Sequence, residues 1–153
     1  MKHFLDISDF NTKKLDLIIN KAKQIKKNPK KFSSLCKNKT LGMIFQKEST
    51  RTRVSFAVGF QKLGGNAIEL NTGSIGFNKR ESAKDIIKTL SQFIDLVVIR
   101  NNDHKLLKKL GDLNLLPIIN GLSDYSHPCQ ILSDMLTINE NLGSIKNNKI
   151  TWI

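Results

Sequence analysis

The chain has 153 residues, with 25 Lys and Arg against 13 Asp and Glu, so its formal net charge is +12, and 39% of its residues are hydrophobic. This length suits one domain, or one domain with the start of another, and buries a core without disulfides. Two cysteines, Cys36 and Cys129, exclude a disulfide framework and favour a reducing compartment, so we expect a cytoplasmic protein. The apolar runs are far shorter than the roughly 20 residues that span a bilayer, so no membrane partner is expected.

The positive charge alone is typical of proteins that bind a phosphate backbone. However, four of the 25 basic residues are arginines, at 51, 53, 80 and 100, and the others are lysines scattered among asparagines. The basic residues form no patch interleaved with aromatic side chains. We therefore expect no nucleic-acid partner.

The first half of the chain alternates between helical and strand patterns. In order, the patterns predict a helix at 13–27, a strand at 40–45, a helix through 54–63, a strand at 67–70 and a loop rich in Gly and Asn at 71–80. Asn11 or Thr12 can cap the first helix, and Gly64-Gly65 ends the second.

The same alternation continues in the second half. It predicts a helix with apolar positions from 83 to 93, a strand at 95–100, a helix at 103–110, a strand at 117–120, a helix starting near 128 and a final strand at 149–153. Strands that alternate with helices predict an α/β fold, here an open parallel four-stranded sheet with helices on both faces. We assign 1–143 to this domain, and 144–153 to a linker and the first strand of a second α/β domain that is missing.

The first predicted strand is followed by Ser49-Thr50-Arg51-Thr52-Arg53 at the start of a helix. Ligands bind outside the carboxyl ends of the strands in such a sheet, and helix N-termini present unpaired N–H groups to anions. The hydroxyl groups and a guanidinium beside these N–H groups predict a phosphate cradle, although a Ser-Thr pair often does no more than cap a helix. Residues two apart on a helix point apart, so one of the two arginines is expected to be structural.

Polar residues also follow the third and fourth predicted strands. Arg100 ends the apolar run 96–99, where a lone arginine is commonly a surface charge. His127 and Gln130 start the last helix and share one face, because they are three residues apart. Convergence at three successive strand ends favours one joint site.

Cys129 lies in the first turn of that last helix, where a thiol can be acidified toward the thiolate. No base to orient a nucleophile accompanies it in the sequence, so we interpret Cys129 as a packing residue. The three histidines lie far apart, and no paired Cys or His spacing typical of a metal site is present, so no metal is expected.

Taken together, these segments resemble a known family. The resemblance covers most of the chain in colinear order and rests on the segments 45–56, 63–65, 119–124 and 127–130. They look like the carbamoyl-phosphate half of an ornithine carbamoyltransferase, and Ser-Thr-Arg-Thr-Arg with His-Pro-Cys-Gln is specific to the aspartate/ornithine carbamoyltransferases. The Asn-Gly-Leu-Ser-Asp segment before His127 favours ornithine as the acceptor.

The resemblance implies transfer of a carbamoyl group from carbamoyl phosphate to ornithine, giving citrulline and phosphate, with no cofactor. It implies that the phosphate is held by Ser49, Thr50, Arg51 and Thr52, and that the carbamoyl group is addressed by Arg100, His127 and Gln130. Arg100, His127 and the Thr52 hydroxyl would then be the catalytic donors that stabilise an oxyanion. The family also implies a homotrimer with sites at subunit interfaces.

Two departures from the family pattern affect this interpretation. The ornithine branch carries a Gln in the loop after the second strand, which reaches a neighbouring subunit's site; the nearest match here is Ser74, as in the aspartate branch, with Lys79 or Arg80 as a further cross-subunit contact. The ornithine-binding half, which carries most of the acceptor specificity, is missing, so we expect ornithine to bind only if that half is present and the chain to be inactive alone. The alternatives are an aspartate, putrescine or acylornithine acceptor, or a non-catalytic anion-binding remnant.

Overall fold

The computed structural model describes residues 3–47, 49–71, 81–143 and 149–151. Its elements in chain order are η1 (Ile7–Asp9), α1 (Thr12–Lys27), η2 (Pro29–Phe32), β1 (Thr40–Phe45), α2 (Thr50–Lys62), β2 (Asn66–Leu70), α4 (Ala83–Leu90), β3 (Leu96–Arg100), α5 (His104–Asp112), β4 (Ile118–Leu122) and α6 (Pro128–Leu142). The bounds agree with the predicted elements to within a few residues.

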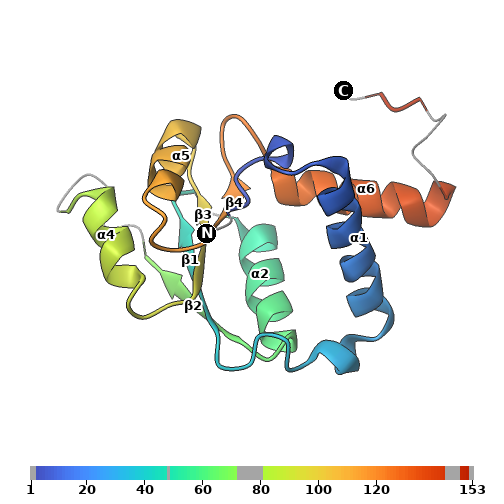
Figure 1. Ribbon diagram of the computed structural model, residues 1–153, viewed down its shortest axis with the longest axis horizontal. Coiled ribbons are helices and arrows are strands. Elements are labelled where there is room, and N and C mark those ends of the chain that lie inside the picture. Colours follow the sequence, from blue (N-terminus) through green and yellow to red (C-terminus); the bar gives the residue numbers. More distant parts are fainter. Residues whose placement is uncertain (1–2, 48, 72–80, 144–148, 152–153) are drawn as a thin grey trace.

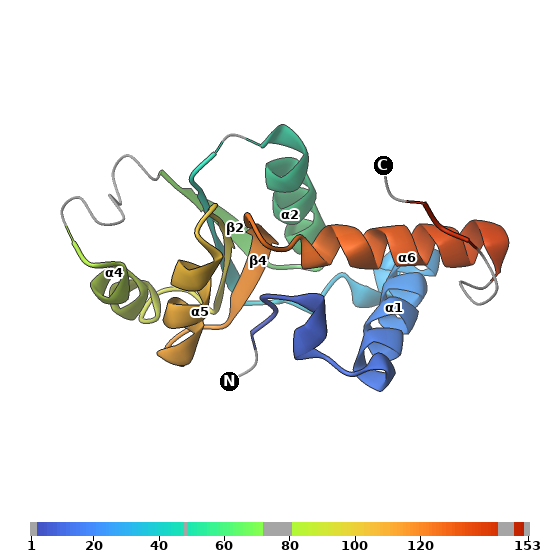
Figure 2. The ribbon, with the colours of Figure 1, turned by 90° about the horizontal axis from the view of Figure 1, so that it is seen from above.

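The four strands form one parallel sheet in the order β2-β1-β3-β4. Helices α4 and α5 lie on one side of it, and α2 lies on the other, with α1 and α6 farther out on the same side (Figure 1). Figure 2 shows α1 and α6 packed together beyond α2. The predicted α/β class, strand number and helix-covered faces are thus confirmed.

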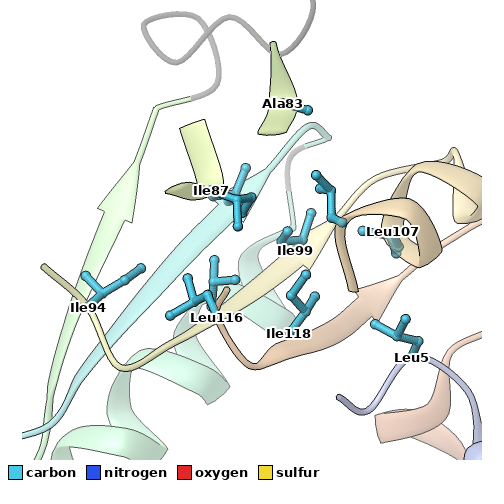
Figure 3. Packing of buried hydrophobic residues seen from close by; sticks show 11 residues of the cluster. Leu5, Ala83, Ile87, Ile94, Ile99, Leu107, Leu116 and Ile118 are labelled. Atoms are coloured by element: carbon cyan, nitrogen blue, oxygen red, sulfur yellow. The ribbon is translucent and has the colours of Figure 1, made fainter. Parts of the chain in front are cut away.

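Alternate residues along each strand point to opposite faces and so build two cores. The core under α4 and α5 contains Ile44, Val97, Ile99 and Ile118 from the strands, and Figure 3 shows Ile87 and Leu107 of the two helices on the same side as Ile99 and Ile118. The opposite core contains Leu41, Met43, Phe45 and Val98, against which Phe56 and Phe60 of α2 pack. The apolar runs of β1 and β3 are therefore explained by burial on both faces, whereas the edge strand β2 keeps Asn66, Ile68 and Glu69 exposed.

Short polar side chains start the helices. The side chains of Asn11, Ser49, Ser82 and Asp103 accept backbone N–H bonds at the starts of α1, α2, α4 and α5. At the end of α2, Gly64 has φ 88°, and a Cβ there would collide with the carbonyl oxygen of Ser33. The predicted stop at Gly64 is confirmed, because only glycine fits that position.

Some expectations differ from the structure or lie outside the described residues. Phe93 was expected on a helix, but α4 ends at Leu90 and the Phe93 side chain is 77% exposed. Residues 149–151 have no regular secondary structure, so the expected final strand is absent there. Ser74, Lys79 and Arg80 lie outside the described residues. Within the described ranges, no helix is long and apolar enough to cross a bilayer.

Candidate functional site

The start of α2 follows the carboxyl end of β1 and carries a chain of hydroxyl groups. Ser49 is the N-cap: its Oγ accepts the Thr52 N–H at 3.4 Å, and its hydroxyl lies 2.8 Å from Thr52 Oγ1. Thr50 is exposed beside them. The N-terminal N–H groups of α2 and two hydroxyls therefore open onto the same end of the sheet, where an anion is favoured.

Arg100 joins the end of β3 to this helix start. It is the last residue of β3 and pairs with Phe45, the last residue of β1, in the parallel register. Its Nη1 donates to Ser49 Oγ at 3.0 Å and lies 3.4 Å from Thr52 Oγ1. The commoner interpretation of such an arginine as a free surface charge is wrong here, because the guanidinium is held at the α2 N-terminus.

His127 is the residue before α6 and lies near the same guanidinium. β4 is irregular just before it, since Ile99 pairs with Asn120 but Arg100 pairs with Leu122, so that Gly121 bulges out of the ladder. Burial lowers the pKa of His127, the nearby Arg100 charge lowers it further, and Asp134 opposes both effects. His127 is therefore neutral near pH 7, and its buried Nδ1 has no hydrogen-bond partner in the described part of the chain.

A hollow of about 270 Å³ lies between the start of α2 and the start of α6. Its lining residues come from these two helices and are Arg51, Thr52, Ser55, Phe56, His127, Cys129, Gln130 and Ser133. Ser49 and Arg100 do not line it, but both contact Thr52, which does. The structure thus brings four predicted site residues, Arg51, Thr52, His127 and Gln130, to the hollow and places Ser49 and Arg100 beside it, whereas Thr50 does not line it.

The two arginines of α2 have different environments. Arg51 lines the hollow, whereas Arg53 lies with Nε 3.0 Å from Glu69 Oε1 on β2 and with its guanidinium carbon 5.8 Å from the centre of the Phe45 ring. The Arg53–Glu69 pair is a charge contact that is not aligned as a hydrogen bond. This agrees with the expectation that one of the two arginines is structural, and Arg53 is that residue.

Gln130 is oriented by a residue that the sequence reasoning missed. Its Nε2 donates to Asp134 Oδ1 at 2.8 Å, one helical turn along α6. Ser55 and Ser133 of the hollow were missed too, and they lie one turn beyond Thr52 and Cys129. A search for polar residues at i+3 and i+4 from the predicted site would have found all three.

The environment of Cys129 favours a packing role. Burial raises the pKa of its thiol to about 11, and Sγ lies 3.8 Å from the Asn120 carbonyl oxygen. A thiolate is therefore strongly disfavoured near neutral pH. The described residues hold no group of three His, Cys, Asp or Glu side chains that could bind a metal ion.

A larger hollow of about 620 Å³ lies at the start of α5, away from these residues. Lys105 and Lys108 line it, but Asp103 and Asp124 line it too. These carboxylates already accept the first N–H groups of α5, from Leu106 and His104. Two of the first three N–H groups of α5 are therefore already bonded to carboxylates, whose negative charge also repels an anion, and the smaller hollow is the better candidate site.

Comparison with known proteins identifies the family of this chain. Residues 2–140 match the family model described as the carbamoyl-P binding domain of aspartate/ornithine carbamoyltransferase. The chain is 43% identical to the ornithine carbamoyltransferase of Ruthia magnifica, with 100% of the chain aligned to 52% of that protein. It is also similar to the structure of ornithine carbamoyltransferase from Pyrococcus furiosus, with a TM-score of 0.90 and 41% identity. This match covers 95% of the chain and 47% of the Pyrococcus furiosus protein.

The resemblance extends to a second acceptor class. The catalytic subunit of M. Jannaschii aspartate transcarbamoylase matches with a TM-score of 0.84 and 32% identity, over 95% of the chain and 49% of that subunit. The chain thus spans about half the length of these relatives. It belongs to the aspartate/ornithine carbamoyltransferase family and corresponds to the carbamoyl-phosphate-binding domain of that family.

Proposed function

We propose that this chain supplies the carbamoyl-phosphate site of an ornithine carbamoyltransferase. The observation that carries the proposal is the contact of Arg100 with Ser49 and Thr52 at the α2 N-terminus, beside His127. That arrangement places a cation, hydroxyl groups, unpaired N–H groups and a neutral imidazole around one small hollow. A small dianion with a carbonyl group at one end matches this set of donors.

The two ends of carbamoyl phosphate are assigned to different residues. Ser49, Thr50, Arg51 and Thr52 hold the phosphate, because they surround the positive end of the α2 dipole. Arg100, His127 and Gln130 address the carbamoyl group. Asp134 supports this assignment, because its hydrogen bond fixes the Gln130 amide.

The reaction follows from where charge develops. A neutral amine attacks the carbamoyl carbon, and negative charge grows on the carbonyl oxygen as the tetrahedral centre forms. Arg100, the Thr52 hydroxyl and an N–H of neutral His127 donate to that oxyanion from fixed positions, which is the arrangement that lowers such barriers. The C–O bond to phosphate then breaks, the departing phosphate takes the proton that the amine nitrogen loses, and the cradle at α2 stabilises this phosphate. This scheme uses neither a metal ion nor a covalent enzyme intermediate.

Ornithine is the proposed acceptor of the whole protein. Two ornithine carbamoyltransferases, which are 43% and 41% identical to the chain, support this choice. The acceptor-binding half is proposed to lie outside this chain, because the chain spans about half of its relatives. Positioning of the amine supplies much of the rate in a two-substrate reaction, so the 153-residue chain alone should be inactive.

We also propose that the whole protein forms a homotrimer and is located in the cytoplasm. The family resemblance supports the trimer, and α2 offers a surface for a second copy, because it buries no residue and leaves Val54 52% exposed and Val58 40% exposed. Ser74 and Lys79 are assigned to a loop that reaches a neighbouring site. The free thiols of Cys36 and Cys129 support a reducing compartment.

Calorimetric titration of the chain tests this proposal. Carbamoyl phosphate, inorganic phosphate and sulfate are compared at about 150 mM salt, where charges more than roughly 8 Å apart are screened. We expect saturable 1:1 binding of carbamoyl phosphate that sulfate does not match. His127→Ala should weaken carbamoyl phosphate more than inorganic phosphate. Equal weakening would overturn the assignment of His127 to the carbamoyl end, and equal affinity for all three anions would overturn the proposed site.

A further inference from the structure

The amino-terminal segment lies against the strand that leads to His127. Phe4 forms an isolated parallel bridge with Ile119 of β4: the Phe4 N–H donates to the Ile118 carbonyl at 2.8 Å, and the Asn120 N–H donates to the Phe4 carbonyl at 2.8 Å. Leu5 then enters the core beside Ile118 (Figure 3). Figure 2 shows this segment passing beside β4 toward the start of α6. The segment therefore extends the sheet at the edge nearest His127.

The loop between β4 and α6 is held by a buried polar network. Asn120 is fully buried, and its Nδ2 lies 2.9 Å from the Leu5 carbonyl and 3.1 Å from the Ser126 carbonyl. The Ser123 N–H donates to the Ser126 carbonyl at 3.0 Å, and the Ser126 N–H donates back to Ser123 Oγ at 3.2 Å. His104 Nδ1 lies 2.8 Å from the same Ser123 hydroxyl. These bonds fix the backbone up to the residue before His127.

Asp6 closes this network from the amino-terminal side. Ser126 Oγ donates to Asp6 Oδ1 at 2.7 Å, and the 9% exposed carboxylate also accepts the Ile7 N–H and the Ser8 hydroxyl, each at 2.7 Å. Burial alone would raise the pKa of Asp6, but these three bonds and the nearby His104 together lower it. Asp6 is thus a carboxylate near neutral pH, and a charged acceptor strengthens each bond that it receives.

We propose that Asp6 is a positioning residue for His127, acting through Ser126. The inference rests on the proposed function, in which His127 addresses the carbamoyl group. The Ser126 side chain donates to Asp6, and the Ser126 carbonyl accepts from Asn120. These two bonds hold the backbone direction at the residue before His127. The buried Nδ1 of His127 has no partner among the described residues, so the ring depends on this backbone for its direction.

Two serines on the same carboxylate provide a matched pair of variants. Ser126→Ala removes the bond on Oδ1 that reaches the His127 loop, whereas Ser8→Ala removes an equally short bond on Oδ2 that does not. Both delete one hydroxyl bound to Asp6. A role of Asp6 in general stability would make the two variants equivalent, while the positioning role makes them different.

Ligand binding by these variants is the first measurement. Because a hydrogen bond to a charged group contributes substantially to order, Ser126→Ala should lower the affinity for carbamoyl phosphate about tenfold. The affinity for inorganic phosphate should change by less than about twofold. Ser8→Ala should leave both affinities unchanged, and Ser126→Thr, which keeps the hydroxyl, should restore tight binding. Asp6→Asn should add little to the loss of affinity in the double variant with Ser126→Ala, because the other bonds of Asp6, with Ile7 and Ser8, do not reach the His127 loop.

The second measurement needs no ligand. NMR spectra of the His127 ring should show one set of resonances in the native chain and in Ser8→Ala, and shifted or broadened resonances in Ser126→Ala and Asp6→Asn. The Thr52 amide serves as an internal reference, since the α2 terminus lies outside the network. Unchanged His127 resonances in Ser126→Ala, or equal effects of Ser126→Ala and Ser8→Ala, would overturn the positioning role. A native chain that binds carbamoyl phosphate no better than phosphate would overturn the proposed function instead, and the ring spectra would still decide the role of Asp6.

Discussion

The two faces of the central sheet are covered very differently. The face under α4 and α5 contains a cluster of 11 buried hydrophobic residues, whereas the buried cluster on the α2 face is Leu41, Met43, Phe45 and Val98. α2 itself buries no residue. The hollow with Arg51 and His127 opens between the starts of α2 and α6, on the side with the smaller buried cluster.

This difference separates stability from chemistry within one small domain. Residues that fill the denser core contribute apolar burial, which is the dominant stabilising term in folding. Residues at the start of α2 and α6 instead keep polar groups available to a ligand. Substitutions in the denser core should therefore lower the free energy of unfolding, whereas substitutions around the hollow should lower the affinity for the ligand.

The largest effect on stability is expected in the denser core. Leu107→Ala should lower the free energy of unfolding by about 2–5 kcal/mol, because Leu107 is fully buried and its truncation leaves a cavity. Leu17→Ala is the matched control, since Leu17 on α1 is 62% exposed and its loss should change stability by less than about 0.5 kcal/mol. Urea unfolding of both variants measures the difference, and equal losses would contradict the asymmetry.

On the opposite face, substitutions of the two α2 arginines should differ in their effect on phosphate affinity. Arg51→Ala should weaken inorganic phosphate by about 1.5–3 kcal/mol, the usual range for a hydrogen bond to a charged group. Arg53→Ala should retain phosphate binding, because the Arg53 guanidinium contacts Glu69 and the Phe45 ring. Calorimetry on both variants tests this pair, and a greater loss of affinity in Arg53→Ala would show that the two roles are exchanged.

A smaller effect is expected in the pH dependence of stability. The pKa of His127 is lowered below its ordinary value of 6.5 by burial and by Arg100, so the unfolded chain binds the proton first as the pH falls through that value. Stability is then lost toward acid, by at most about 1.4 kcal/mol per pH unit. His127→Gln should flatten this part of the curve, which urea unfolding between about pH 7 and pH 5 measures. An unchanged slope would show that His127 is not the group responsible.

The smallest effect should come from Asp134. Its charge raises the pKa of His127 against burial and Arg100, so Asp134→Asn should lower that pKa further while an amide oxygen still accepts from Gln130. An NMR titration of the His127 ring measures the shift. A pKa that rises in this variant would mean that Asp134 acts on His127 by another route than its charge.

The central strands β1 and β3 could be predicted because burial on both faces gives each of them a continuous apolar run. β1 has the predicted bounds 40–45, and the run 96–99 lies within β3 as expected. Phe93 was misassigned because its spacing from Ile86 and Leu90 continues a helical pattern after the helix has ended. α4 ends in local turns, in which the Phe93 and Ile94 N–H groups donate to the Leu90 carbonyl, and a periodic apolar pattern does not report such an end.

The site was predicted as far as strand order and helix spacing allowed. Arg100 and Ser49 could be placed together because both follow strands of one parallel sheet, and the carboxyl ends of such strands meet. The partner of Arg53 could not be predicted, since Arg53 lies on α2 and Glu69 on β2, and no local spacing relates the two. The contact of Asp6 with Ser126 joins residues 120 positions apart, so no local pattern could reveal it.

That separation also determines when the site becomes complete during folding. Closing a loop of this length costs on the order of 4 kcal/mol of chain entropy before the contact returns any energy. β1, β2 and β3 pair over shorter separations and can form before it. At a synthesis rate of about 5–20 residues per second, Ser126 is made roughly ten seconds after Asp6. The Asp6–Ser126 contact can therefore form only after β4 and the loop to α6 have been made, and in our proposal His127 acquires its final direction only at that step.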